Sequence, residues 1–341
     1  MTHLSKSAEI MRGLADAALL AVVAIGSVAG VPVLVRASWP RRSPAAAILL
    51  WQAIGLAGGI ATVGTLLGLA VPADHTSVAS AFGRLPALAA AGRHGPAFLI
   101  AGRVLCLAAG LALLTVLCWV LIAATAAVLS ARRRQRALLA LLAHGDPKVP
   151  GALVVDHPAA AAYCLPGLRS KIVVSAGTLK LLGPAELAAV LAHERAHLRE
   201  RHDLVLLPFT ALRRAFPRSG LCTDAYHAVA LLVEMLADDR ARRCGPAREL
   251  VSALVRVGTA GQGQVPAGAL AAVSATAGAE GEVAARVTRL LRPVHPLPVT
   301  ATAAICCGAA LLAAAPVVLL ILLAIAESSA SAGHQVLVGR V

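Results

Sequence analysis

The sequence predicts a mainly α-helical membrane protein in which four transmembrane helices carry one α+β domain, inserted between the third and the fourth helix. The chain of 341 residues is 58% hydrophobic and only 14% charged, and its mean hydropathy of +0.78 exceeds that of water-soluble domains. The hydrophobic residues gather in four runs that contain no formal charge. Between the third and the fourth run lies a segment of ordinary polarity, long enough to enclose a core of its own.

Each run is long enough to cross the hydrocarbon core of a bilayer, which takes about 20 helical residues. The first run exceeds the apolar core of a signal peptide, which spans about 7–15 residues, so we expect it to be retained. We therefore divide the chain into a membrane region at 1–130 with spans at about 17–35, 45–71 and 104–129, a domain at 131–298, a fourth span at 299–326 and a short tail at 327–341.

Arginine placement predicts which side of the membrane the domain occupies. The loop between the first two spans carries Arg36, Arg41 and Arg42, and four more arginines stand within 132–136, directly after the third span. Because basic residues concentrate on the cytosolic side, we expect a multi-pass protein of the cell membrane with its domain in the cytosol and both termini outside. Two basic residues near the N-terminus oppose this orientation, but the cluster after the third span is stronger.

The net charge of +14 does not indicate direct nucleic-acid binding. Many of the basic residues flank the spans, and only 3% of the chain is aromatic, so few rings are available to stack on bases. Contact with anionic headgroups of the lipid bilayer explains the charge more economically.

Within 131–298 the prolines, glycines and apolar residues predict a mixed order of helices and strands. We expect a helix that continues the third span to residue 142, a strand at Ala152–Val155, a Pro-Gly turn at 163–167, a strand at Lys171–Ser175, a short helix at 176–182, helices at 184–201, 224–244 and 283–291, and a flexible stretch at 258–282. The apolar stretch at 203–214, which ends in two arginines, is expected to lie against the bilayer. The strand with Ile172, Val173 and Val174 is expected to be a sheet edge that pairs with an extended peptide through main-chain hydrogen bonds.

The string His193-Glu194-Arg195-Ala196-His197 lies in the helix expected at 184–201. Residues four apart share one face of a helix, so the two imidazoles can bind one zinc ion. Glu194 projects beside them, where a carboxylate can take a proton from zinc-bound water. The alternative is a solvated helix face with two incidental histidines, and for the carboxylates discussed next it is a charged helix face that balances Arg240, Arg242 and Arg243. The combination of the two features favours a zinc site.

A catalytic zinc usually has three protein ligands, and two candidates compete for the third place. Asp203 follows the second histidine by six residues, but Glu200 stands where a sharp return of the chain needs a glycine. If the helix continues through Glu200, Asp203 points away from the histidines. Glu234 lies on another expected helix, one turn before Asp238. We favour Glu234 as the ligand, with Asp238 as acceptor for the free ring N–H of a ligand histidine.

These motifs resemble the BlaR/MecR-type membrane metallopeptidases, relatives of the HtpX-type and CAAX prenyl proteases. The resemblance covers the order of spans and domain, and it is carried by 163–179 (YCLPGLRSKIVVSAGTL), 186–202 (ELAAVLAHERAHLRERH) and 234–238 (EMLAD). It implies a zincin-like, gluzincin-type metallopeptidase domain with one zinc ion. It also implies His193, His197 and Glu234 as ligands, Glu194 as the catalytic base and Asp238 as the carboxylate behind the ligands.

A positive group must also stabilise the oxyanion of the reaction. Arg286 resembles an arginine near the end of related peptidase domains and is one candidate, although a solvated arginine fits its position equally well. His227 and His295 are weaker candidates. Cys164 is interpreted as a small apolar filler rather than a nucleophile.

The chain departs from the family in two places. His202 stands five residues after the second histidine, where the family often has an aspartate, so the role of that aspartate does not transfer directly. The antibiotic receptors of the family carry an extracellular sensor domain after the fourth span, and the tail at 327–341 is too short for one. We therefore do not expect β-lactam sensing.

The activity that we expect is zinc-dependent endopeptidase cleavage of a cytosolic protein, such as a BlaI/MecI-like transcriptional repressor in a signalling pathway. One alternative is a non-catalytic signalling or scaffold protein that retains the fold, although the intact Glu194 argues against it. A second is a general quality-control protease of HtpX type. A metal transporter is disfavoured because the predicted spans contain no acid or histidine.

Overall fold

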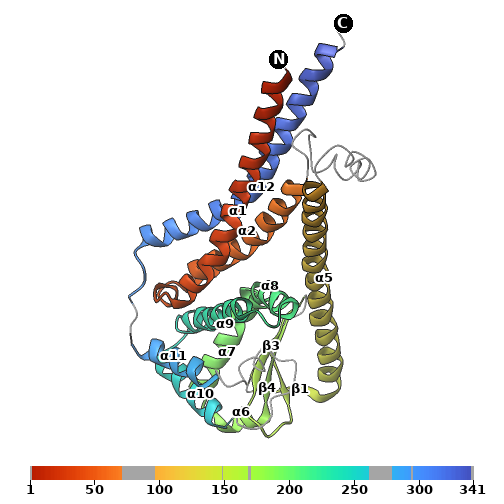
Figure 1. Ribbon diagram of the computed structural model, residues 1–341. Coiled ribbons are helices and arrows are strands. Elements are labelled where there is room, and N and C mark those ends of the chain that lie inside the picture. The colour runs from red at the N-terminus through yellow and green to blue at the C-terminus, as the bar shows by residue number, and fades with distance from the viewer. Residues whose placement is uncertain are drawn as a thin grey trace. The chain divides into compact units, whose positions relative to one another are not determined.

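The computed structural model (Figure 1) describes residues 2–70, 97–147, 149–167, 170–260, 279–292 and 295–338. The chain folds into two compact units. The first comprises Met1–Arg36, Leu49–Trp119 and Thr300–Val341, and the second comprises Ala37–Ile48 and Val120–Val299. The second unit contains the segment expected to form the inserted domain.

Long helices make up the first unit. They are α1 (Thr2–Arg36), most of α2 (Pro44–Ala70), the first half of α5 (Ala97–Leu142) and α12 (Val299–Val338). Small residues let α1 and α2 approach closely: a Cβ placed at Gly58 would lie 3.0 Å from the Cβ of Ser27. Such contacts are typical of helices that associate in lipid. α12 continues as a helix to Val338, beyond the predicted end of the fourth span.

Five helices in the described part of the chain are long and apolar enough to cross a membrane. Four of them, Ala17–Arg36, Pro44–Ala70, Ala101–Leu142 and Val299–Leu322, coincide with the predicted runs. The fifth is α9 (Gly220–Ala241), which belongs to the second unit. There Val229, Met235 and Ala237 are fully buried, and α9 packs against α7 and α8, so burial within the domain accounts for its apolar composition. The number of spans stays a prediction.

A four-stranded sheet forms one side of the second unit. Its strands are β1 (Ala143–Gly145), β2 (Ala152–Val155), β3 (Ala162–Leu165) and β4 (Lys171–Ser175), in the order β1-β2-β4-β3. β2 and β4 run parallel, and the outer strands pair antiparallel to them. The strands predicted at β2 and β4 are confirmed, whereas β1 was not predicted.

The prediction of a sheet edge at Ile172, Val173 and Val174 is wrong. β4 pairs with β2 on one side and with β3 on the other, so that Ile172 faces both Ala152 and Cys164. The error arises because the Pro-Gly turn was expected to begin at residue 163. The residues before that turn form a strand instead, and this strand, β3, is the edge of the sheet nearest to α7.

Six helices complete the second unit together with the end of α5, which is helical to Leu142 as predicted. They are α6 (Ala176–Leu181), α7 (Pro184–Arg199), α8 (His202–Ala215), α9, α10 (Ala247–Ala260) and α11 (Ala279–Leu291). α7 lies between the sheet and α9 (Figure 1). α10 and the start of α11 fall where a flexible stretch was expected at 258–282, and the part between them, 261–278, lies outside the described residues.

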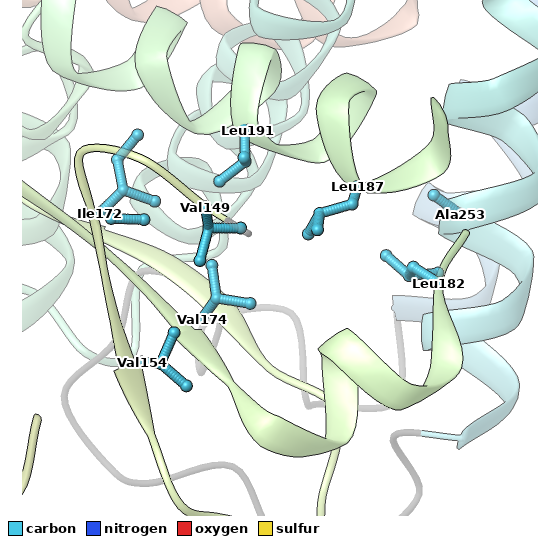
Figure 2. Packing of buried hydrophobic residues seen from close by; sticks show 9 residues of the cluster. Val149, Val154, Ile172, Val174, Leu182, Leu187, Leu191 and Ala253 are labelled. Carbon is cyan, nitrogen blue, oxygen red and sulfur yellow. The ribbon is translucent and has the colours of Figure 1, made fainter. Parts of the chain in front are cut away.

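The core between α7 and the sheet holds α7, the helix that carries His193 and His197, in place. Figure 2 shows Leu187 and Leu191, one turn apart on α7, directed toward Val174 and its neighbours on the sheet. The N-terminus of α7 is fixed by Pro184 at its first turn and by Glu186, whose Oε2 accepts a hydrogen bond from the backbone N–H of Gly183. The opposite face of α7 is thereby presented to α9.

α7 ends at Arg199, so the prediction of a continuous helix over 184–201 is wrong. Glu200 caps the helix, and Arg201 adopts the left-handed conformation with φ of 52° before α8 begins at His202. A left-handed non-glycine residue reverses the helix path at a small conformational cost. The turn returns His202 to the side chains of α7.

Candidate metal centre

His193 and His197 face each other across one turn of α7. Both side chains are buried, and their Nε2 atoms lie 3.1 Å apart. The core contacts of Leu187 and Leu191 set the rotation of the helix, because these residues occupy the face next to the sheet. The histidines consequently point toward α9.

Glu234 completes the group from α9. Its Oε2 lies 3.4 Å from Nε2 of His193, and its Oε1 lies 3.5 Å from Nε2 of His197. One ligand atom from each residue lies within 4.8 Å of the others. Two zinc ligands at about 2.0–2.2 Å in tetrahedral geometry are separated by about 3.3–3.6 Å. The two distances from Glu234 lie within this range, and the 3.1 Å between the two histidine nitrogens is slightly shorter. The two-nitrogen, one-oxygen donor set is one that zinc accepts.

Asp203, the competing candidate for the third ligand, lies elsewhere. Its carboxylate accepts a hydrogen bond from Arg132, in the C-terminal half of α5, and forms an ion pair with this arginine. The expectation that Asp203 stays out of the histidine group agrees with the structure, although the reason given for it was incorrect. The helix does break after His197, but the break directs His202 rather than Asp203 to the centre.

Asp238 supports His193 from behind. Its Oδ1 lies 3.0 Å from Nδ1 of His193, and its side chain is 1% exposed. Burial lowers the pKa of His193, but the hydrogen bonds to Asp238 and Glu234 outweigh it and raise this pKa to about 10. The imidazole is thus an electron-rich ligand, and a metal ion must displace its proton to bind.

His202 supports His197, a contact that the sequence analysis did not predict. The two Nδ1 atoms lie 2.9 Å apart, and His202 is 1% exposed. Burial lowers the pKa of His197 to about 3; the charge of Glu234 opposes this effect, and those of His193 and His202 reinforce it. The only signal in the sequence was the departure from the family pattern at position 202.

Glu194 follows His193 on α7, and the pKa of its carboxyl group is higher than usual for a glutamate. Burial and the charge of Glu234 raise its pKa to about 7, against an opposing effect of His193. The thiol of Cys164, on β3, hydrogen-bonds to Glu194, and burial raises the pKa of this thiol. Cys164 is therefore held as a thiol, in agreement with its interpretation as a filler. A carboxyl group that titrates near neutral pH suits proton transfer.

Arg286 is a clamp on the carboxylates of the centre. From α11, its Nε and Nη2 atoms donate to Asp238 at 2.9 and 2.7 Å, and Nη1 lies 2.8 Å from Oε2 of Glu234. Its side chain is 9% exposed, so the solvated-arginine alternative is wrong. Because these three nitrogen atoms face protein carboxylates, the geometry favours a positioning role over direct contact with an oxyanion.

The two weaker candidates make other contacts. His227 is 45% exposed in its side chain and lies 3.8 Å from Glu282. The backbone carbonyl of His295 accepts a hydrogen bond from Arg42. Neither contact involves the ligand histidines.

The match to a family model is confined to this unit. No curated protein and no solved structure matches the chain. The model of peptidase family M48 matches residues 129–228, from the third predicted span through the whole H-E-x-x-H helix into α9. The match ends before Glu234, Asp238 and Arg286, which the structure brings close to the histidines. Residues 129–228 thus carry the sequence pattern of the M48 metallopeptidases, a family of hydrolases, within a chain rich in membrane-type helices.

Proposed function

We propose that this protein is a membrane-embedded zinc metalloendopeptidase. The observation that supports it best is the group of His193, His197 and Glu234, whose donor atoms lie close enough together to bind one metal ion. A second carboxylate, Glu194, stands beside this group and has a raised pKa. The match to peptidase family M48 supports the same activity.

The residues of the chain would divide the chemistry among them. Zinc, when bound, supplies the Lewis acidity that polarises a peptide carbonyl. The carboxylate of Glu194 takes a proton from the attacking water and then donates it to the leaving amine. The backing residues Asp238 and His202 orient the ligand imidazoles. Arg286 holds Glu234 and Asp238 as carboxylates.

We infer that an extended peptide binds along β3. This strand lies at the end of the described sheet, contacts α7 and carries Cys164, whose thiol reaches Glu194. An edge strand binds a peptide through main-chain hydrogen bonds and so makes few demands on its sequence. β3 thus takes the role that was first assigned to Ile172, Val173 and Val174.

The substrate is proposed to be a cytosolic protein, because the arginines after the third span favour a cytosolic domain. The resemblance to antirepressor peptidases supports regulatory cleavage, for instance of a transcriptional repressor. General quality control is the alternative that the M48 match supports equally well. Regulatory cleavage and quality control predict different results when the activity is lost: a single uncleaved protein accumulates in the first case, and many proteins accumulate in the second.

The test compares cells carrying the wild-type protein with cells carrying Glu194→Gln, an isosteric change that cannot accept the water's proton. We expect the purified variant to retain stoichiometric zinc and to lose all peptide cleavage. Protein fragments that are present in wild-type cells and missing from cells with Glu194→Gln identify the substrate. Wild-type cleavage by the variant, or a wild-type protein that binds no zinc, would refute the proposal.

Orientation can be tested with a native residue. Cys244 is exposed in the second unit, so a membrane-impermeant thiol reagent should modify it only after the cells are permeabilised. The Cys244→Ser variant is the control for labelling at other cysteines. Modification of Cys244 in intact cells would place the domain outside and exclude a cytosolic substrate.

A further inference from the structure

We propose that His202 is a positioning residue that orients the ligand His197 and fixes which of its ring nitrogens carries a proton. The inference rests on the proposed function, because it concerns the same metal centre. It gives this chain a ligand pair with two different supports, a carboxylate behind His193 and an imidazole behind His197.

The contact between the two imidazoles needs one shared proton. Their Nδ1 atoms lie 2.9 Å apart, which is hydrogen-bond distance for two ring nitrogens. In such a pair one nitrogen must donate and the other must accept. Two donors would repel each other, and two acceptors would leave buried lone pairs unsatisfied.

The direction of this hydrogen bond follows from the metal centre. Nε2 of His197 faces Nε2 of His193 and Oε1 of Glu234, so it must offer its lone pair to the metal. Its proton is therefore on Nδ1 and points to His202. Nδ1 of His202 must then be the acceptor, which places the proton of His202 on Nε2.

The surroundings of His202 suit this tautomer. Its Nε2 lies 3.4 Å from Oε2 of Glu200, and the other oxygen of that carboxylate is held by Arg240. Nε2 of His202 is fully buried and makes no hydrogen bond to any described residue, so the carboxylate of Glu200 is a nearby charge rather than a hydrogen-bond partner. A protonated Nε2 is consequently drawn toward Glu200, and the chain of contacts runs from the metal centre through two imidazoles to an ion pair at the surface.

The backbone places His202 for this role. Glu200 ends α7, and Arg201 reverses the chain in the left-handed conformation. His202 is then the first residue of α8, and its ring packs edge-on against His197 with centroids 4.8 Å apart. Had α7 continued, residue 202 would have pointed well around the helix from His197.

The support differs in charge from the one behind His193. The group next to Nδ1 of His193 is the carboxylate of Asp238, which forms an ion pair with Arg286 on its other side. His202 is a neutral acceptor, and the nearest carboxylate on its far side, Glu200, is one ring away. His197 should therefore be the less basic of the two ligands, since a carboxylate behind an imidazole raises its basicity more than a neutral acceptor does.

The experiment compares three variants of the full-length, detergent-solubilised protein by zinc affinity in chelator competition. His202→Leu removes the acceptor and should weaken zinc binding by about 10–100-fold, the usual effect of losing a partner behind a ligand. His202→Asn keeps an oxygen acceptor near the position of Nδ1 and should retain affinity within tenfold of wild type, as an expected order of magnitude. His227→Leu changes an exposed histidine and is the matched control, with wild-type affinity.

A spectroscopic readout separates positioning from general packing. In the zinc-loaded protein with ¹⁵N-labelled histidine, the ring signals of His197 and His202 should show protons on Nδ1 and Nε2 respectively. This measurement needs only the wild-type protein, so it decides the inference even if His202→Leu does not fold. A proton on Nδ1 of His202, or equal zinc affinity in wild type and His202→Leu, would overturn it. Failure of the wild-type protein to bind zinc would instead overturn the proposed function.

Discussion

Replacing Arg286 with methionine distinguishes two roles for this arginine: holding the carboxylates of Asp238 and Glu234, or stabilising the oxyanion of the reaction. Methionine fills part of the same volume but removes the charge that faces Asp238 and Glu234 at 2.7–2.9 Å. Asp238 is 1% exposed, so its carboxylate would lose the arginine and face only the imidazole of His193 in a site that water barely reaches. Removing one partner of a buried ion pair costs about 3–5 kcal/mol.

This cost predicts a large fall in the unfolding temperature of the second unit. For a domain of this size, about 1 kcal/mol shifts the midpoint by about 2–4 °C, so we expect a fall on the order of 6–20 °C for Arg286→Met in the presence of a chelator. Zinc should recover part of the loss, because the ion also neutralises Glu234. The matched control is Arg248→Met, since the side chain of Arg248 is 82% exposed and its ion pair among the described residues is with Glu249, an arrangement that contributes about 0–1 kcal/mol.

The assay is thermal unfolding of the solubilised protein, repeated in an Asp238→Asn background. Asparagine carries no charge, so Arg286→Met should cost much less there than in the wild type, and the difference measures the coupling of the pair. If Arg286 acts instead on the oxyanion, Arg286→Met will keep the wild-type midpoint and zinc affinity and lose turnover alone. That result would refute the clamp.

Three further outcomes follow from the centre and its supporting helix. Glu234→Ala should reduce zinc affinity far more than Asp203→Ala, measured by chelator competition, because Asp203 is paired with Arg132 away from the centre; the opposite order would make Asp203 the ligand. Asp238→Asn should reduce zinc affinity by about 10–100-fold, and an unchanged affinity would show that His193 needs no carboxylate behind it. Glu186→Gln should lower the unfolding midpoint at pH 7, since hydrogen bonds from Ser252 and the Gly183 backbone, with the charge of Arg256, lower the pKa of Glu186 below its usual 4.5. A lowered carboxyl pKa stabilises the fold above pH 4.5, so the difference from wild type should shrink as the pH falls below that value, and a constant difference would contradict this assignment.

The local pattern of the sequence was sufficient for much of the fold. The charge-free runs predicted four long apolar helices, and the strands at Ala152–Val155 and Lys171–Ser175 were predicted with the bounds that they have. Proline at the first turn of α7 and the H-E-x-x-H spacing predicted that His193 and His197 share a helix face. These features depend on residues near each other along the chain, which hydrophobic periodicity and helix geometry relate directly.

The order of the strands in the sheet could not be predicted from local sequence patterns. β3 and β4 have similar apolar residues, and only their hydrogen bonds to neighbours decide that β4 is internal and β3 is the edge. Pairing is a property of segments brought together in space, so one strand's sequence cannot show which of its sides is free.

The sequence by itself determined the membrane-type helices and the H-E-x-x-H motif, and it suggested Glu234 and Asp238 as partners of the two histidines. Only the tertiary structure decided what stands behind each ligand, since the clamp of Arg286 joins residues 48 positions apart. The same holds for His202, which a single left-handed residue, Arg201, turns back to His197. Helix propensity favours continuing through 199–201, and the small cost of the left-handed turn is met by packing and hydrogen bonds that form only once α7, α8 and α9 have assembled.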